Sequence, residues 1–326
     1  MEPGVSGHLI AETPITIVDT ETTGLYPGGD RIIELAVIRV EPGREPAIVL
    51  DTLVNPGRPV AATEIHGITD ADVADAPTFA DVAPALLDAM KGSVFASYNV
   101  YFDAKFLQDE LSRVGIRRFP PHLCLMYLRP MLGLGRRCTL RDACASSSIN
   151  LTGAHQASAD AVAAAELWSL YVATCRKAGI QTFGQLAALK SYKFTASFSD
   201  GLFDSTHQLP RVSSVSFRPR RTAAVTAVAP EALPNRQAVL AEYWEALAAA
   251  MADMDLTSHE VFYLRAKQQA LGIQPSEMRW LHARAFASVL ATVCNDKQIS
   301  NDEATALSGI ARSLRDLGWA PGDAPD

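Results

Sequence analysis

Two carboxylates stand at the end of an apolar strand near the start of the chain. The segment "ITIVD", residues 15–19, has the composition of a buried strand, and Glu21 and a Thr-Thr-Gly turn follow it. Because successive side chains of a strand point to opposite faces, Asp19 and Glu21 point to the same face. Burying charge costs several kcal/mol unless something compensates it. With no Lys or Arg close by in the sequence, the pair indicates a hard cation such as Mg²⁺ or Mn²⁺.

The elements that follow are typical of an α/β fold with a mixed sheet flanked by helices. We expect strands at residues 15–19, 31–40, 47–54, 93–97 and 122–128. We expect helices at residues 78–91, 101–115, 139–147 and from about 156 to 177. The first strands follow one another in hairpin order, and the later ones alternate with helices, so the sheet is predicted to contain both antiparallel and parallel strands.

Two further acids lie on helix faces that should be apolar. Asp103 shares its predicted face with Leu107, Leu111 and Val114, which must pack on the sheet. Asp160 lies in the first turn of the last long helix of this region, whose inward stripe is Ala163, Ala164, Leu167 and Tyr171. Neither position suits an acid for stability alone, so both carboxylates are predicted to join the pair on the first strand. His155 precedes Asp160 by five residues, in a polar stretch where it is expected to be partly exposed.

Three segments, "DTETTG", "YNVYFDAKFL" and "HQASAD", resemble the three motifs of DEDDh 3′–5′ exonucleases, the family of the proofreading epsilon subunit of bacterial DNA polymerase III. The resemblance spans roughly residues 14 to 178 and implies an RNase H-like fold. The segments "EIHGITDADV" and "TLRDACASSSIN" are also similar to family segments between the motifs. The chain departs from the family at "HLCLMYLRP", where many members carry an acid, although this is not one of the five catalytic positions.

By this resemblance, the catalytic residues are Asp19, Glu21, Asp103, His155 and Asp160. The four acids would hold two Mg²⁺ or Mn²⁺ ions at the scissile phosphate, and His155 would deprotonate the attacking water. The products would be nucleoside 5′-monophosphates released from a 3′ end.

The residues expected to contact the terminal nucleotide are Thr22, Gly24, Leu25, His66, Asn99 and Phe102. A plainer interpretation makes Thr22 and Leu25 turn and core residues and has His66 bond within its own loop. The expected substrates are single-stranded or frayed DNA 3′ ends, during replication proofreading or repair. One alternative is an RNA 3′ exonuclease of the RNase T or oligoribonuclease kind. The sequence does not separate DNA from RNA substrates, because discrimination between them rests on contacts to the 2′-OH. The other is a non-catalytic module that binds nucleic-acid ends and recruits a partner.

The composition changes after about residue 205. Residues 211–230 contain four arginines and no acid, and we interpret them as a solvated linker, the alternative being a basic strip that contacts a nucleic-acid backbone. The predicted domains are an exonuclease domain at 10–180, a connecting segment and basic linker at 181–236, and a C-terminal all-α domain at 237–320. The all-α domain resembles, more weakly, TerB-like domains through "TSHEVFYLRAKQQALG" and "CNDKQISNDEATAL".

Two helices of this C-terminal region begin with capping-box spacing. Thr257 and Glu260 open one helix, and Ser300 and Glu303 open another. A cation site made of Asp296, Asp302 and Glu303 is the alternative to the second cap. A DNA polymerase or another replication or repair protein is the partner expected to bind this domain.

Composition limits the function classes further. The net charge of −7 over 326 residues argues against a protein that coats nucleic acid by bulk attraction, but bound cations would let an enzyme act on it. The five cysteines are scattered and include no CxxC pair, which favours a reducing cytoplasm. We expect a cytoplasmic protein, because no apolar run is long enough for a membrane span and the N-terminus lacks the pattern of a signal peptide.

Overall fold

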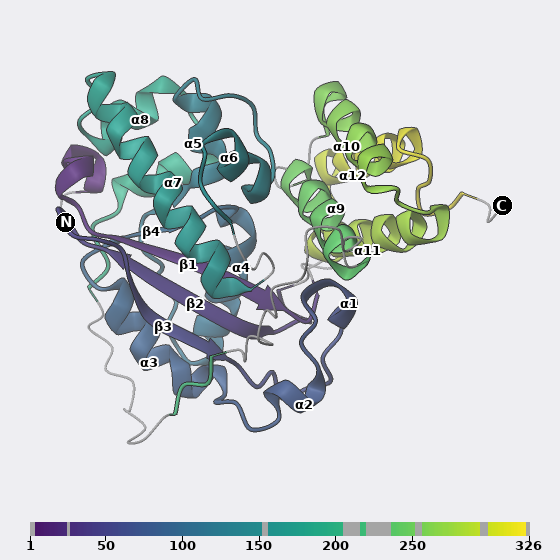
Figure 1. The fold of residues 1–326 in the computed structure, drawn as a ribbon, viewed down its shortest axis with the longest axis horizontal. Helices are drawn as coiled ribbons and strands as arrows, with labels where there is room; N and C mark the ends of the chain where they lie inside the picture. Colours follow the sequence, from purple (N-terminus) through teal and green to yellow (C-terminus); the bar gives the residue numbers. More distant parts are fainter. Residues whose placement is uncertain are drawn as a thin grey trace. The chain divides into compact units, whose positions relative to one another are not determined.

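The computed structural model describes residues 4–24, 27–151, 156–204, 216–219, 236–251, 256–293 and 299–323 (Figure 1). The chain divides into two compact units. The first consists of Met1–Thr23, Arg31–Ala61 and Ile68–Thr222. The second consists of Gly24–Asp30, Ala62–Gly67 and Ala223–Asp326.

A five-stranded mixed sheet forms the centre of the first unit. Its strands are β1 (Ile15–Thr22), β2 (Ile32–Val40), β3 (Ala47–Leu53), β4 (Val94–Ser97) and β5 (His122–Cys124), in the order β3-β2-β1-β4-β5. The pairs β1–β2 and β2–β3 are antiparallel, whereas β1–β4 and β4–β5 are parallel. The predicted RNase H-like class, a mixed sheet flanked by helices, is therefore confirmed.

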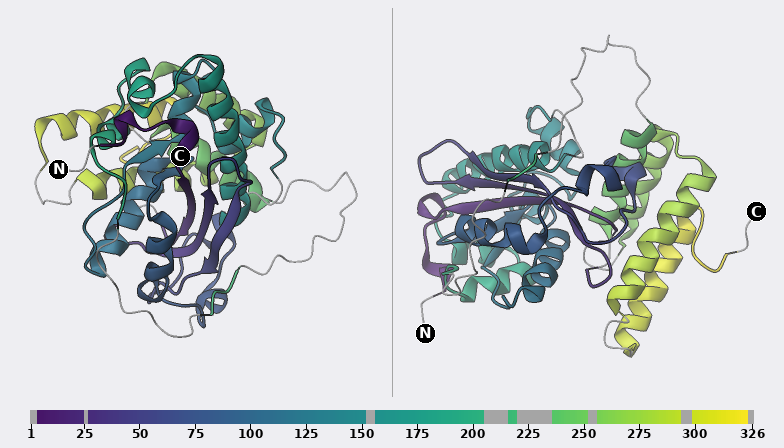
Figure 2. Two further views of the ribbon diagram at one scale, coloured as in Figure 1. Left: turned by 90° about the vertical axis from the view of Figure 1, so that its left-hand side faces the viewer. Right: turned by 90° about the horizontal axis from the view of Figure 1, so that it is seen from below.

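Helices cover both faces of this sheet (Figure 2). They are α2 (Asp70–Val73), α3 (Phe79–Met90), α4 (Val100–Arg113), α5 (Leu125–Met131), α6 (Leu140–Ser146), α7 (Ala157–Lys177) and α8 (Phe183–Leu189). Short 3-10 segments lie at Val5–Gly7, Ile10–Glu12 and Lys193–Ser199. Helix α7 packs on β1, β2 and β3, and α4 packs on β1, β4 and β5.

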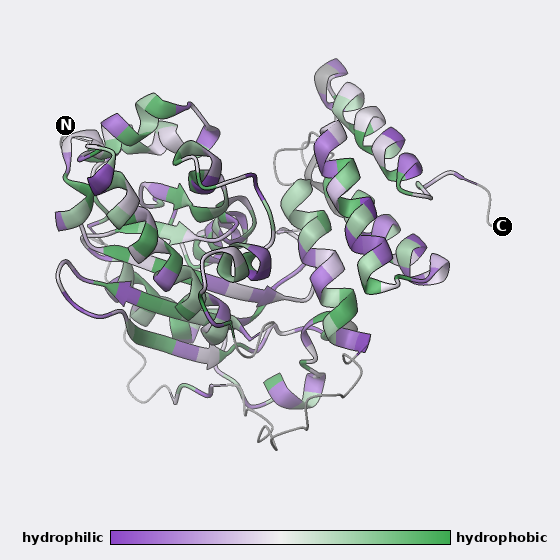
Figure 3. Ribbon diagram, turned by 45° about the horizontal axis from the view of Figure 1, so that its top comes forward, coloured by the Kyte–Doolittle hydropathy of each residue, from purple (hydrophilic) through white to green (hydrophobic). Residues whose placement is uncertain are grey.

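The central strands supply most of the core of the first unit. The side chains of Ile15, Ile17, Val18, Ile32 and Val37 are fully buried. Figure 3 shows the hydrophobic residues concentrated along these strands. Since charged groups are excluded from such an interior unless they are compensated, acids on these strands need a specific explanation.

The last predicted strand of the sheet is shorter than expected. Residues 122–128 were expected to form one strand, but β5 ends at Cys124 and α5 begins at Leu125. All four residues from Leu125 to Leu128 are buried, and the N–H of Met126 donates to the carbonyl of Tyr98. A short run that is buried on every side has no periodicity, so strand and helix look alike in its sequence.

Part of the predicted linker lies along the edge of the sheet. The N–H of Leu53, at the end of edge strand β3, donates to the carbonyl of Arg218 at 2.7 Å. The N–H of Arg218 donates to Thr52 Oγ1 at 3.0 Å, and its guanidinium lies 3.6 Å from Asp75. Residues 216–219, the only part of 205–235 that the structure describes, are exposed, and Arg218 is hydrogen-bonded to the end of β3.

The second unit is helical, as the sequence predicts for the C-terminal region. It contains α1 (Thr63–His66), α9 (Arg236–Ala250), α10 (Ser258–Leu271), α11 (Pro275–Val293) and α12 (Asn301–Asp316). Its core includes Ile65, Tyr243, Leu247, Leu264, Leu281, Ile310 and Leu314. Among the residues that the structure covers, no helix combines the length and apolar character that crossing a bilayer requires.

Both predicted capping boxes are present in this unit. The Glu260 carboxylate accepts hydrogen bonds from the N–H and hydroxyl of Thr257, and Glu303 does the same for Ser300. The Glu303 carboxylate therefore caps its helix, as the capping-box spacing predicts, whereas the alternative prediction made it part of a cation site. Asp296 lies outside the described residues.

A buried polar network in the second unit was not predicted from the sequence. His282 is fully buried, and its Nδ1 lies 2.8 Å from the carbonyl of Trp319. Because a carbonyl only accepts, Nδ1 carries the proton, and Nε2 accepts from the Tyr243 hydroxyl at 2.9 Å. Gln268 donates to the Tyr243 oxygen at 2.8 Å. These bonds suit a neutral imidazole, and burial lowers the pKa of His282 below its ordinary value.

This network should make the second unit less stable in mild acid. The folded state binds fewer protons at His282 than the unfolded state, so the stability that the neutral ring contributes is present above about pH 6.5 and is lost as the pH falls. Urea unfolding at pH 7.5 and 5.5 tests this, followed by tryptophan fluorescence, since Trp244, Trp280 and Trp319 all lie in this unit. His282→Gln should flatten the pH dependence. An unchanged pH dependence in the variant would contradict the assignment.

Candidate metal centre

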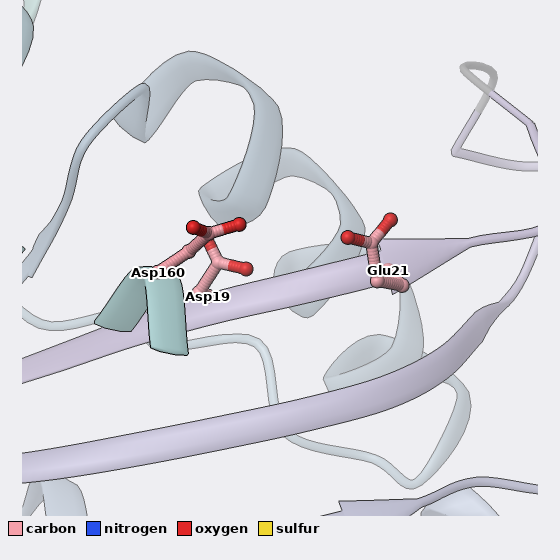
Figure 4. A group of neighbouring side chains, drawn as sticks. All are labelled: Asp19, Glu21 and Asp160. Carbon is pink, nitrogen blue, oxygen red and sulfur yellow. The ribbon is translucent and has the colours of Figure 1, made fainter. Parts of the chain in front are cut away.

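Three carboxylates meet where β1 and α7 come together. Asp19 and Glu21 project from β1, and Asp160 reaches them from the first turn of α7 (Figure 4). One ligand oxygen from each lies within 4.8 Å of the others. Asp160 is buried, and the two strand acids are half-buried. The structure therefore brings together three of the four acids predicted to form one site.

The local structure explains how these residues meet. Asp19 and Glu21 are two positions apart on β1, and they pair with Ala36 and Glu34 of β2. The register shifts between Glu21 and Thr22, so the regular ladder ends just beyond the second acid. Helix α7 approaches β1 and β2 through an alanine-rich face whose buried members are Ala157, Ala161, Ala164 and Ala165. Small side chains on that face let the helix backbone, and Asp160 with it, come close to the sheet.

Asp103 is hydrogen-bonded to Thr20, the residue of β1 between Asp19 and Glu21. Its Oδ1 accepts hydrogen bonds from the backbone N–H of Thr20 at 3.1 Å and from the Thr20 hydroxyl at 2.8 Å. Burial raises the pKa of Asp103 to about 6, and hydrogen bonds to its carboxylate, those from Thr20 among them, oppose the rise. A nearby cation would favour the charged form instead. The predicted inward orientation is observed, because only 4% of Asp103 is exposed.

A salt bridge fixes α4, the helix that carries Asp103, against the start of β2. The guanidinium of Arg31 donates to both oxygens of Glu110, each at 2.7 Å, and also to the carbonyl of Pro56. Glu110 accepts the N–H of Ile32 as well. Such a forked, hydrogen-bonded pair restricts orientation as well as position. Asp103, seven residues before Glu110, is thereby held at the end of β1.

The arrangement suits a hard divalent cation. Three carboxylates in so small a space repel one another, and a bound cation removes that repulsion. Oxygen ligands are those that Mg²⁺ and Mn²⁺ prefer. Asp160 also lies in the first turn of a 21-residue helix, where the helix dipole favours a carboxylate.

The residues predicted to bind the terminal nucleotide fall in different places. Thr22 is buried at the end of β1, and Asn99 occupies the N-cap position of α4. Phe102 is half-buried, with its ring centroid 5.0 Å from that of Phe106. These three residues and the acids of the candidate metal centre belong to the same unit.

The other residues predicted for the site either belong to the second unit or lie outside the described residues. Gly24 and His66 belong to the second unit, where His66 is buried and the carboxylate of Asp30 fills the space beside Gly24. His155 and Leu25 lie outside the described residues, so their roles stay predictions.

Two further acids near the centre were not singled out from the sequence. Glu34 of β2 is fully buried, and Asp51 of β3 is half-buried. The signal was present for Glu34, because an acid in the middle of the apolar run "IIELAV" is costly to bury. Asp51 gives a weaker signal, since its strand begins exposed and its inward face is not obvious from the sequence.

Comparison with known proteins assigns the segment that carries this centre to a family. Residues 16–168 match the RNase T family model, described as an exonuclease. The matched segment contains Asp19, Glu21, Asp103 and Asp160.

Relatives of known sequence include a "DNA polymerase III subunit epsilon-like protein" from Rhodobacter capsulatus. It is 37% identical over 187 residues, which cover 54% of this chain and 27% of the relative. A "DNA polymerase III PolC-type" from Bacillus subtilis is 32% identical over 184 residues, covering 55% of this chain and 13% of the relative. The chain therefore matches only a minor part of each of these longer proteins.

Solved structures with partial similarity include E. coli exonuclease I in complex with a dT13 oligonucleotide. That match has a TM-score of 0.44 and 19% identity, and covers 52% of this chain and 43% of the other. The nuclease domain of 3′hExo, a DEDDh family member bound to rAMP, matches with a TM-score of 0.42 and 18% identity, covering 54% and 96% of the two chains.

Removing one charge from the centre should stabilise the metal-free protein. In chelator, Asp160→Asn is expected to raise the free energy of unfolding by about 1 kcal/mol, because it relieves repulsion among three close carboxylates. Added Mg²⁺ should raise the melting temperature of the wild type and have much less effect on the variant. Thermal unfolding with and without Mg²⁺ measures both effects. Glu166→Gln, an exposed acid on the same helix, is the control. Equal Mg²⁺ stabilisation of Asp160→Asn and wild type would show that Asp160 is not a ligand.

Proposed function

We propose that this protein is a metal-dependent 3′–5′ exonuclease that hydrolyses phosphodiester bonds at DNA 3′ ends and releases nucleoside 5′-monophosphates. The observation that carries the proposal is the meeting of Asp19, Glu21 and Asp160 within 4.8 Å, in a segment that matches the exonuclease family. Asp103, held at the neighbouring Thr20, supplies the fourth acid of the motif set.

Each side chain has a distinct role in this proposal. Asp19, Glu21, Asp103 and Asp160 hold two Mg²⁺ or Mn²⁺ ions, which when bound stabilise the charge that develops on the attacking and leaving oxygens. His155 accepts the proton of the attacking water, a role that suits a group titrating near neutral pH. The buried carboxylates restrict the direction from which a phosphate can approach.

The substrate end is proposed to bind beside the acids. Thr22 and Asn99, at the end of β1 and before the first turn of α4, are proposed to contact the terminal nucleotide with Phe102. Gly24, Leu25 and His66 are the further proposed contacts from the sequence motifs. In this proposal these six residues position the terminal nucleotide, and the acids hold the ions at the phosphodiester bond that is hydrolysed.

DNA is the proposed substrate because the relatives carry the names of DNA polymerase III proteins. We further propose a role in replication proofreading or repair, with the C-terminal helical domain, residues 237–320, binding a polymerase or another replication or repair protein. Cleavage of RNA in preference to DNA would instead assign the chain to RNA 3′ processing, since the 2′-OH distinguishes the two.

A labelled oligonucleotide assay tests the activity. With Mg²⁺, a 5′-labelled single-stranded DNA should shorten stepwise, and excess chelator should stop the reaction. Asp19→Ala should lower the rate by more than about 100-fold, because even the loss of an outer-sphere partner reaches that size. Glu166→Gln should match the wild type. A competing RNA oligomer in the same reaction identifies the preferred sugar.

Three outcomes would contradict the proposal. Activity that persists in chelator would exclude the metal-dependent reaction. Equal degradation by wild type and Asp19→Ala would show that the site is elsewhere. Binding of DNA ends without cleavage, in Mg²⁺ and in Mn²⁺, would favour the non-catalytic end-binding module.

A further inference from the structure

The first turn of α7 interacts with two acids from neighbouring strands. Glu34 Oε2, on β2, accepts the backbone N–H of Ala157 at 3.3 Å. Asp51, on β3, lies close enough to Ser158 for that side chain to favour the charged form of the Asp51 carboxylate, whereas burial raises its pKa. Two consecutive residues at the start of the helix therefore each interact with a different strand.

The register of the sheet places these acids on the face that carries the metal centre. Asp19 pairs with Ala36, and Ala36 pairs with Asp51. Glu21 pairs with Glu34. Because residues directly opposite one another on neighbouring strands point to the same face, all four acids point toward α7. Ala36 lies between two of them and leaves room for the helix.

The buried carboxyl group of Glu34 calls for an explanation beyond stability. A fully buried carboxylate costs free energy that an apolar side chain at the same place would not. The N–H of Ala157 and the dipole at the start of α7 offset part of this cost. What an apolar residue could not do is fix the helix start, since it offers no acceptor. Ala157 and Asp160 lie in the same helical turn, so a bond at Ala157 restrains the backbone that carries the metal-binding carboxylate.

We propose that Glu34 and Asp51 are positioning residues that hold the first turn of α7 so that Asp160 reaches the cation bound by Asp19 and Glu21. The proposal rests on the proposed function, because it takes Asp160 to be a metal ligand. Neither Glu34 nor Asp51 is assigned a contact with the substrate.

The acceptor role of Glu34 is tested by two substitutions of similar size. Glu34→Leu removes the acceptor and should weaken Mn²⁺ binding about tenfold, as loss of an outer-sphere partner does. Glu34→Gln keeps an oxygen that accepts the Ala157 N–H, so it should retain most of the affinity. Free Mn²⁺ is measured by electron paramagnetic resonance with the full chain. If Glu34→Gln loses as much affinity as Glu34→Leu, the charge of Glu34 acts rather than its hydrogen bond, and the proposal fails.

The Asp51 contact is tested by a double-mutant cycle. Asp51→Ala and Ser158→Ala each remove one side of the proposed contact, the first from the strand and the second from the helix. Each should weaken Mn²⁺ binding, and the double variant should bind no more weakly than the poorer single variant, because the two residues act through one contact. Additive losses would contradict the proposed contact. Ser158→Ala changes no residue of the sheet. If Glu34→Leu does not fold, Ser158→Ala therefore still tests whether contacts to the first turn of α7 affect Mn²⁺ binding.

Two reference variants separate positioning from stability and from the function itself. Ser93→Ala removes a fully buried hydroxyl that bonds Thr16, on β1 three residues before Asp19, and should lower the melting temperature without changing Mn²⁺ affinity. Asp160→Asn marks the loss of a ligand. If Asp160→Asn binds Mn²⁺ like the wild type, the proposed metal centre is wrong. If Asp160→Asn loses affinity while Glu34→Leu keeps it, only the positioning role is wrong.

Discussion

Repulsion among close carboxylates is the constraint on which the rest of the first unit depends. Asp19, Glu21 and Asp160 approach within 4.8 Å although like charges at that distance oppose folding. The sheet and α7 have to supply the free energy that holds them there, through the buried strands and the alanine face of the helix. Carboxylates held together in this way would need little reorganisation to bind a cation.

Much of the fold could be predicted from the sequence because the informative signals are local. The apolar strand 15–19 and the hairpin order of the strands after it predict the antiparallel part of the sheet. The alternation of side chains along a strand predicts that Asp19 and Glu21 lie on one face. The helical face of Asp103 and the capping boxes at Thr257 and Ser300 are also patterns of a few residues. In each case the neighbours that determine the structure lie within one or two turns of the chain.

What could not be predicted depends on contacts between distant segments. The helical conformation of residues 125–131 depends on packing around a run whose first five residues, 125–129, are buried, and its sequence has no period that distinguishes helix from strand. The alignment of Asp19, Ala36 and Asp51 across three strands is a matter of register, which turn lengths and bulges determine. The roles proposed for Glu34 and Asp51 could therefore not be inferred before their neighbours on α7 were known.

The hydrogen bonds between Arg218 and the end of β3 have a consequence for aggregation. An edge strand with exposed apolar side chains, as Ile48 and Val49 are on β3, is a template on which another chain can add a strand. Arg218 occupies the hydrogen-bonding positions at Thr52 and Leu53, and Pro219 follows it with no N–H to extend the ladder. Arg218 thus covers part of the edge of β3, and Pro219 offers no N–H to which a further strand could bond.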